Sequence, residues 1–293
     1  MTKHDAPHDQ LTLRSQVLIT AAELAALQAG ANPPVLLVVW AAETDSALPR
    51  AERPRIPGAI DTDLATEFAA AGGGLKGSRP LPEIADLQIH ARRWGITDQR
   101  MVVVYDIAGG LQAGRAWWTL RWAGLSQVRL LDGGLAAWRA AGLPIADRAP
   151  SVSAGDVLLS AGHMPVMTAD EAQALARRGL LLDTRISPNY RGGPTAPGEP
   201  KRGHIPGAAS VPAASNLTPD GSFLPPRQLR ALYAAAGVTD DKEVGIYCGA
   251  GVSAAHAVAA LATLGIAAPM YVGSWSAYSA DPARPAASGD LPG

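Results

Sequence analysis

The chain has 293 residues, of which 47% are hydrophobic and 17% are charged, and its formal net charge is −1. This length is enough for about two domains with ordinary packed cores. The near-zero charge gives no reason to expect nucleic acid or an anionic membrane surface as a partner. The only cysteine is Cys248. A single cysteine excludes intrachain disulfides and a cysteine-based metal site, and we expect no metal and no cofactor.

The N-terminal segment, Met1 to Gln10, is polar and lacks the apolar core of a signal peptide. No apolar run approaches the roughly 18 residues that a membrane-spanning helix needs. These two features predict a soluble, cytoplasmic protein.

Short apolar runs rich in branched residues alternate with helical patterns along the chain. The predicted strands are 35–40, 101–105, 128–131, 180–184 and 244–247. The predicted helices are 20–29, 115–122, 169–178, 226–236 and 253–264. This alternation predicts an α/β fold, with parallel strands joined by crossover helices.

Several motifs occur twice, which indicates an internal duplication. Ile-Pro-Gly-Ala stands at 56–59 and again at 205–208, and the segment 131–138 recurs weakly as 271–278. We therefore predict two copies of one domain, at 1–145 and 166–293, each with a mostly parallel central sheet flanked by helices. The Gly/Pro/Ser-rich stretch 146–165 is the predicted linker.

The two copies differ at the residue expected to carry chemistry. Tyr105-Asp106 and Tyr247-Cys248 are each followed by a small-residue loop and a helix. The first copy therefore has no thiol, and we expect it to be inactive and to shape the cleft at the domain interface. Asp106 itself is expected to be a solvated loop residue.

Cys248 lies where a predicted strand ends and a loop leads into a helix. The loop consists of Gly249, Ala250, Gly251, Val252 and Ser253. Backbone N–H groups and the helix dipole at such a position stabilise a thiolate. Ser253 is expected to cap the helix or to donate its hydroxyl to the sulfur. The alternative is that Cys248 is a small buried hydrophobic residue.

Five motifs resemble the tandem-rhodanese sulfurtransferases, which comprise thiosulfate and 3-mercaptopyruvate sulfurtransferases. They are 181–185 (LLDTR), 190–192 (YRG), 203–208 (GHIPGA), 220–225 (DGSFLP) and 248–254 (CGAGVSA). Segments 102–106 and 131–135 are similar to the family's inactive N-terminal domain. The resemblance implies a ping-pong reaction in which Cys248 takes a sulfur from a small anionic donor, holds it as a persulfide and passes it to cyanide or a thiol.

The loop residues bear on the donor that the resemblance implies. Thiosulfate-specific members carry two cations after the cysteine, whereas Gly249 and Ala250 resemble the mercaptopyruvate type. Ala250 departs from that type because it lacks a hydroxyl, and Asn189 departs because an arginine is usual there. The expected donor-binding residues are Arg185 and Arg191, with Arg191 facing the cleft; further candidates are Arg79, Arg202 and Trp275.

Other functions are excluded or left open by the sequence. A cysteine phosphatase needs Cys-x5-Arg, but the sixth residue after Cys248 is Ala254. A phosphate-binding P-loop fails because no Gly-Lys-Ser/Thr follows the glycines. A sulfur-carrier or sensing module that turns over little remains an alternative. We expect His204 to be a structural hydrogen-bonding residue and His256 to face solvent.

Overall fold

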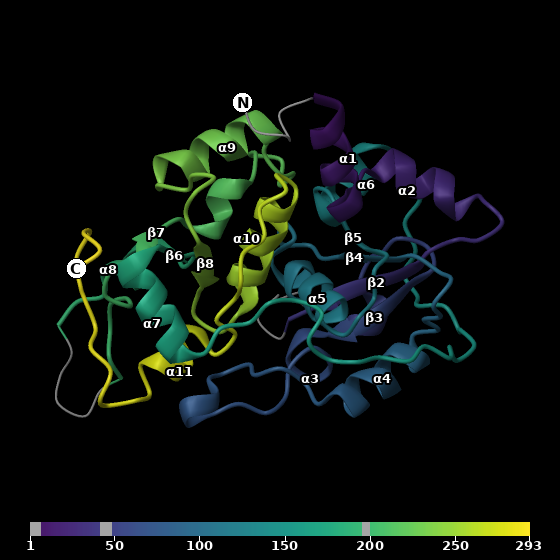
Figure 1. Cartoon of the computed structure of the whole chain (residues 1–293). Helices are drawn as coiled ribbons and strands as arrows, with labels where there is room; N and C mark the ends of the chain where they lie inside the picture. The colour runs from purple at the N-terminus through teal and green to yellow at the C-terminus, as the bar shows by residue number, and fades with distance from the viewer. Residues whose placement is uncertain (1–6, 42–48, 195–199) are drawn as a thin grey trace.

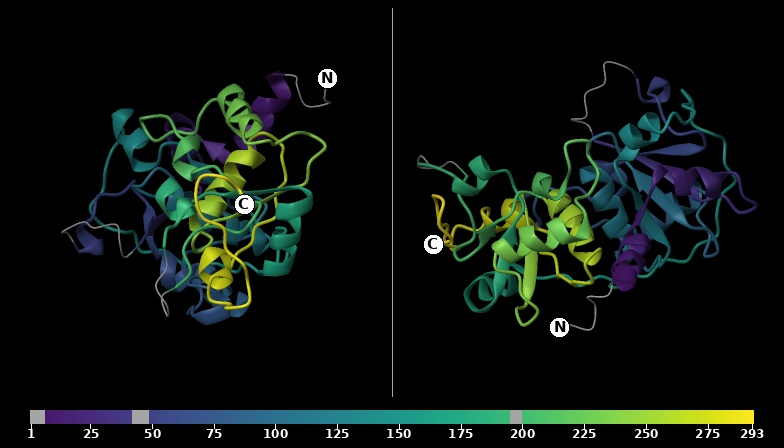
Figure 2. Two further views of the ribbon diagram at one scale, coloured as in Figure 1. Left: turned by 90° about the vertical axis from the view of Figure 1, so that its left-hand side faces the viewer. Right: turned by 90° about the horizontal axis from the view of Figure 1, so that it is seen from above.

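The computed structural model describes residues 7–41, 49–194 and 200–293. The chain forms two α/β domains that lie side by side, with the N-terminal domain in purple to blue and the C-terminal domain in green to yellow (Figures 1 and 2). No helix in the described residues is long and apolar enough to cross a membrane.

The N-terminal domain is built on a five-stranded parallel sheet with the order β1-β5-β4-β2-β3. Its strands are β1 (Leu18–Ile19), β2 (Val35–Trp40), β3 (Ala59–Asp63), β4 (Val102–Tyr105) and β5 (Val128–Leu131). Its helices are α1 (Pro7–Val17), α2 (Ala21–Gln28), η1 (Arg50–Glu52), α3 (Leu64–Glu67), η2 (Gly74–Lys76), α4 (Ile84–Arg93), α5 (Leu111–Trp122) and α6 (Gly134–Ala140). Alternate residues of β2 pack against α4 and α5 on one face and against α2 and α6 on the other.

The C-terminal domain repeats this arrangement. Its strands are β6 (Leu180–Asp183), β7 (Ala209–Ser210) and β8 (Val244–Tyr247), in the parallel order β7-β6-β8. Parallel bridges from Met270 to Ile246 and to Val166 extend the sheet on the β8 side. The helices are α7 (Ala169–Arg178), α8 (Ser187–Arg191), η3 (Ala213–Asn216), α9 (Pro226–Ala235), α10 (Val252–Ala262) and α11 (Ser274–Tyr278). When these bridge residues are counted as strands, the sheet of the C-terminal domain has the same strand order as the sheet of the N-terminal domain. A duplication predicts this agreement.

The helices α5 and α10, which follow the two corresponding loops, pack against each other across the domain interface (Figure 1). A Cβ atom on Gly114 would lie 2.8 Å from the Cα of His256, so only glycine permits this approach. One hydrophobic cluster runs through both helices and contains residues of both sheets, among them Val104 and Ile246. The two domains therefore share this cluster, and each has a second hydrophobic cluster of its own.

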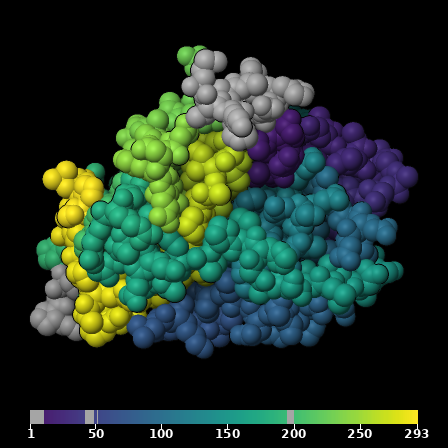
Figure 3. All heavy atoms as spheres, in the orientation of Figure 1, coloured from purple at the N-terminus to yellow at the C-terminus, as the bar shows by residue number. Residues whose placement is uncertain are grey.

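The N-terminal helix and the interdomain segment also connect the domains. Arg14 of α1 pairs with Asp132 at 2.8 Å and donates to the carbonyl oxygens of Phe223 and Leu224. Between α6 and α7 the chain forms no helix or strand beyond bridge residues, and the predicted linker 146–165 falls in this stretch. Figure 3 shows the two domains in close contact, with the blue N-terminal loops below the yellow C-terminal segment.

Candidate active site

Cys248 comes directly after β8 and lies at the carboxyl end of the parallel sheet. Its side chain is buried, with 2% of the residue exposed. The N–H of Gly251 donates to the Cys248 Sγ at 3.1 Å. Gly251 is the N-cap of α10 and has a left-handed φ of 75°. The strand, the tight loop and the helix N-terminus thus direct one backbone donor at the sulfur, which favours an anionic form.

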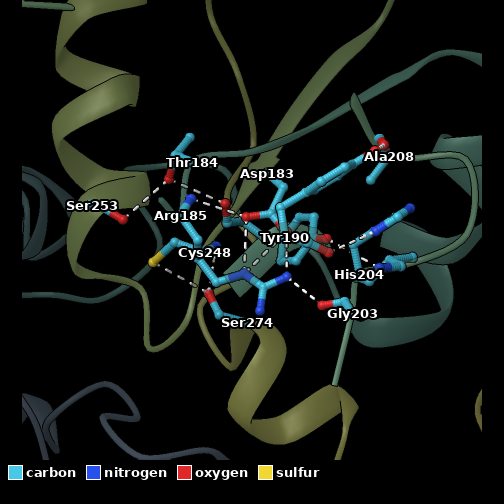
Figure 4. A network of polar contacts seen from close by, with 12 residues as sticks. Asp183, Thr184, Arg185, Tyr190, Gly203, His204, Ala208, Cys248, Ser253 and Ser274 are labelled. Carbon is cyan, nitrogen blue, oxygen red and sulfur yellow. Dashed lines mark hydrogen bonds and ion pairs between the residues drawn. The ribbon is translucent and has the colours of Figure 1, made fainter. Parts of the chain in front are cut away.

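The segment that begins α11 supports the Cys248 loop from below (Figure 4). The Ser274 Oγ accepts the Cys248 N–H at 3.2 Å and lies 3.9 Å from the Sγ. Trp275 N–H donates to the Cys248 carbonyl at 2.8 Å, and Ser276 N–H to the Gly249 carbonyl at 2.9 Å. Among the described non-glycine residues, Ser274 is the one with a positive φ, 53°. Backbone strain of this kind persists where the surrounding structure holds it and often accompanies a functional site.

Ser253 does not cap α10, because Gly251 occupies the N-cap and Ser253 is the second helical residue. The expectation of a serine cap is therefore wrong. Its hydroxyl instead lies 3.2 Å from the Thr184 Oγ1, which also donates to the Tyr247 carbonyl. Ser253 thus connects α10 to the strand end beside β8.

A cavity of about 390 Å³ opens next to the loop. It is lined by Arg185, Pro188, Asn189, Gly192, Lys201, Arg202, Gly249 and Trp275. The loop residue Gly249 brings this cavity to within one residue of Cys248. Three of the lining side chains are cationic, so the cavity suits a small anion.

Arg185 is held mainly by Asp183. Its Nε and Nη2 donate to the Asp183 carboxylate, with Nη2 at 2.6 Å, and Nη2 also donates to the Gly203 carbonyl. Burial opposes the charge, but the Asp183 interaction outweighs it and raises the pKa of Arg185. The guanidinium lies 4.8 Å from the Trp275 ring centroid. Arg185 is thus fixed as a wall of the cavity, with its charge largely balanced.

The other predicted cations lie in different places. Arg191 forms an ion pair with Asp290, its side chain is 55% exposed, and it is not among the residues that line the cavity. The expectation that Arg191 faces the cleft is therefore not met. Arg202 lines the cavity, as does Lys201, whose Nζ donates to the carbonyls of Asp281 and Pro282.

The N-terminal domain reaches the site through the loop that carries Arg79. Ser78 N–H donates to the Ser276 Oγ at 2.9 Å, and η2 packs against α11. Arg115 of α5 is fully buried and donates to the Gly251 carbonyl at 3.3 Å and to the Arg79 carbonyl at 3.1 Å. Sequence reasoning missed both Arg115 and Ser274. The signal for Arg115 was an arginine within the otherwise apolar helix segment 113–118.

Asp106, which occupies the place of Cys248 in the N-terminal domain, is fully buried, so the expectation of a solvated residue is wrong. Its carboxylate accepts four backbone N–H groups at 2.7–2.9 Å, from Ala108, Gly110, Gln112 and Ala113. Burial raises the pKa of Asp106, and these four bonds oppose that rise. The four N–H groups occupy the acceptor positions of both Asp106 carboxylate oxygens, and a proton on either oxygen would point at an N–H. The ionised form of Asp106 therefore fits this site best.

The structure agrees with the prediction for His204 and disagrees with the prediction for His256. His204 is buried, contacts the carbonyls of Tyr190 and Pro292, and stacks on the Tyr190 ring, which confirms its structural role. His256 is also fully buried, so the expectation that it faces solvent is wrong. It stacks on Phe223 at a centroid distance of 4.5 Å and packs at the domain interface. Burial lowers the pKa of His256 to about 4.

Within the described residues, no group of three or more His, Cys, Asp or Glu side chains is placed to hold a metal ion.

Comparison with known proteins gives the family. The rhodanese-like domain family matches residues 44–141 and 168–281. "Putative thiosulfate sulfurtransferase SseB" of Mycobacterium tuberculosis is 43% identical over 282 residues, covering 94% of this chain and 98% of that one. "Probable 3-mercaptopyruvate sulfurtransferase" of Pseudomonas aeruginosa is 41% identical over 286 residues, covering 95% and 100%.

A solved structure agrees with this match. The crystal structure of the 3-mercaptopyruvate sulfotransferase SseA from Escherichia coli superposes with a TM-score of 0.74 at 26% identity, covering 88% of this chain and 98% of that chain. The duplicated sheets, the cysteine loop and these relatives agree, and the chain belongs to the tandem-rhodanese sulfurtransferase family.

Proposed function

We propose that this protein transfers a sulfur atom from a small anionic donor to cyanide or a thiol through a persulfide on Cys248. The observation that carries the proposal is the Gly251 N–H, which lies 3.1 Å from the Cys248 Sγ, next to the cationic cavity that Gly249 lines. A thiolate so placed is a nucleophile that can accept sulfur and hold it as an anion.

The Asp106 loop supports the persulfide as the loaded state of the cysteine loop. The carboxylate oxygens of Asp106 lie two bonds beyond Cβ, the same number of bonds as the outer sulfur of a cysteine persulfide. In the N-terminal domain, four backbone N–H groups bind those oxygens. The duplicated loop at Cys248 presents the same type of cradle at the N-terminus of α10, and a persulfide extends one atom further into it than a thiolate does.

The proposed reaction has two displacement steps. The Cys248 thiolate attacks the sulfur of the donor, and an S–S bond forms as the bond between that sulfur and the rest of the donor breaks. With 3-mercaptopyruvate the C–S bond breaks, and pyruvate leaves after its methylene carbon takes the proton of the donor thiol. With thiosulfate the S–S bond breaks and sulfite leaves. Cyanide or a thiolate then attacks the outer sulfur, and the Cys248 thiolate is regenerated.

Charge near the sulfur favours 3-mercaptopyruvate over thiosulfate as the donor. The residues next to Cys248, Gly249 and Ala250, carry no charge, and Asp183 balances Arg185. The Nη1 of Arg185 is the guanidinium nitrogen that neither Asp183 nor the Gly203 carbonyl engages, and Arg202 also lines the cavity. The uncharged loop residues and the balanced Arg185 suit one carboxylate better than a dianion, for which two cations directly after the cysteine are expected.

The test is a cyanide-acceptor assay with both donors. We expect thiocyanate formation from both, with the higher kcat/KM for 3-mercaptopyruvate, and a complete loss in Cys248→Ser. Incubation with donor alone adds the mass of one sulfur atom to the wild-type protein and none to Cys248→Ser. Absence of turnover from both donors, in protein whose thiol is shown to be reduced and open to alkylation, contradicts the proposal and favours the carrier or sensing module.

A further inference from the structure

A buried arginine of the N-terminal domain reaches into the active site of the other domain. Arg115 stands in the middle of α5 and is fully buried. Its guanidinium donates to the carbonyls of Phe68, Arg79 and Pro80 in its own domain. Its Nη1 crosses the interface and donates to the carbonyl of Gly251 at 3.3 Å.

Every hydrogen-bond partner of this guanidinium is an uncharged carbonyl. Among the residues that the structure describes, no carboxylate forms an ion pair with Arg115. A buried charge without a counter-ion costs several kcal/mol, so an anion is expected close by. Burial, which the Cys248 sulfur opposes and the positive charge of Arg79 reinforces, lowers the pKa of Arg115 to about 10. The sulfur is thus the nearby group that can supply the negative charge.

The geometry joins the guanidinium to the sulfur through one residue. Gly251 accepts from the Arg115 Nη1 through its carbonyl and donates to the Cys248 Sγ through its N–H. A Cβ atom on Gly251 would lie 2.7 Å from that Nη1, so the guanidinium closes against the loop backbone. The guanidinium therefore holds the residue whose N–H contacts the sulfur.

We propose that Arg115 is a positioning residue for Cys248: it fixes Gly251 against the sulfur and supplies the positive charge that stabilises the thiolate and the persulfide. The inference rests on the proposed role of Cys248 as nucleophile. It gives the domain that lacks a thiol a direct electrostatic part in the reaction. The effect on the sulfur combines a held backbone donor with a low-dielectric charge interaction.

The ionisable side chains around Cys248 and Arg115 come from several elements. They are Arg185 after β6, Tyr247 in β8, His256 in α10 and Arg79 in the loop after η2. Burial raises the pKa of Tyr247 well above its usual value and lowers the pKa of His256 to about 4. Neither group titrates between neutral and mildly alkaline pH, so a change in Cys248 reactivity over that range does not come from them.

The experiment measures alkylation of Cys248 by iodoacetamide, at neutral and at mildly alkaline pH, in full-length protein without sulfur donor. Arg115→Gln keeps a hydrogen-bond donor but removes the charge, and we expect alkylation about tenfold slower at neutral pH. Arg115→Lys keeps the charge but loses the planar fork, and we expect about a threefold loss. Both deficits should become smaller at alkaline pH, because a high pH favours the reactive thiolate in every variant.

The control is Arg55→Gln, which removes another fully buried arginine whose contacts, including its ion pair with Asp61, lie within the N-terminal domain. It should leave the alkylation rate unchanged. An unchanged neutral-pH rate in Arg115→Gln, or a deficit that does not become smaller at alkaline pH, overturns the proposal. If Arg115→Gln does not fold, the same two criteria apply to Arg115→Lys. Alkylation needs no sulfur donor. The role of Arg115 can therefore be judged from the alkylation rates even if the protein fails to transfer sulfur.

Discussion

The two loops that follow the corresponding strands β4 and β8 meet the same requirement in different ways. Each ends a buried strand, turns through glycine in a left-handed conformation and begins a helix at the domain interface. The first places the carboxylate of Asp106 among four N–H groups, whereas the second places the thiol of Cys248 against one. The chain's own carboxylate fills the first loop, and we propose that a transferred sulfur atom on Cys248 fills the second. Under the proposed function, both copies share an anion-binding loop, and the residue at its centre distinguishes the copy that we propose to be catalytic.

Exchanging the central residue tests this comparison most severely. Cys248→Asp should abolish thiocyanate formation and yet be more stable than Cys248→Asn by about 1 kcal/mol, because a carboxylate uses the backbone donors of the loop. The measurements are the cyanide-acceptor assay and urea unfolding. If Cys248→Asp is instead less stable than Cys248→Asn, the loop around Cys248 is not an anion cradle.

Removing the carboxylate from the first loop should cost stability. Asp106→Ala leaves four buried N–H groups without their acceptor, and we expect a loss of about 3 kcal/mol in the free energy of unfolding. Asp98→Ala, at an exposed position of the same domain, is the control and should change the free energy by less than about 0.5 kcal/mol. Urea titration measures both. Similar values for the two variants would show that the Asp106 bonds do not support the fold.

Acid should weaken the interface on which both loops depend. His256 has a pKa of about 4 in the folded protein against 6.5 as its ordinary value, so the unfolded chain binds the proton more readily. Stability from this group is complete above about pH 6.5 and falls as the pH drops towards 4, by about 3 kcal/mol. Unfolding free energies across this range should fall less steeply in His256→Leu than in the wild type. Parallel profiles would exclude His256 as the source.

Arg202 and Arg191, the two exposed candidates for donor binding, should differ in their effect on the KM, and this effect is smaller than those above. Arg202→Gln should raise the KM for the anionic donor about fivefold, because Arg202 lines the cavity beside Gly249. Arg191→Gln should change KM less than about twofold, because Arg191 is half exposed and pairs with Asp290 away from that cavity. Steady-state kinetics with 3-mercaptopyruvate measure both. The reverse order would restore Arg191 as the donor-binding residue.

Much of the fold was predictable from periodicity and repetition. The runs at 128–131 and 244–247 coincide with β5 and β8, and the helix at 169–178 coincides with α7. The short strands β1 and β7 have two residues each, too few for an alternating pattern to identify them. The helix α4 also went unpredicted: it is polar on its outer face and begins without a side-chain cap.

The candidate site was predictable where the residues are adjacent in sequence and not where the fold brings distant residues together. Cys248 and its loop follow from the strand, the small residues and the helix. Arg115 and Ser274 come from elements whose approach to Cys248 depends on the packing of the two domains and of α11. His256 was misjudged for the same reason, because Gly114, one of the neighbours that bury it, belongs to the other half of the chain.

The packing of α5 against α10 has a consequence for how the protein unfolds. Because one hydrophobic cluster includes residues from both sheets, neither half can lose its structure without exposing apolar surface of the other. The duplicated chain should therefore melt in one cooperative transition, with equal calorimetric and van't Hoff enthalpies, although it consists of two domains. The copy without a thiol would then contribute to stability through this shared cluster, and a gene truncated to the cysteine-bearing half should not yield a stable protein.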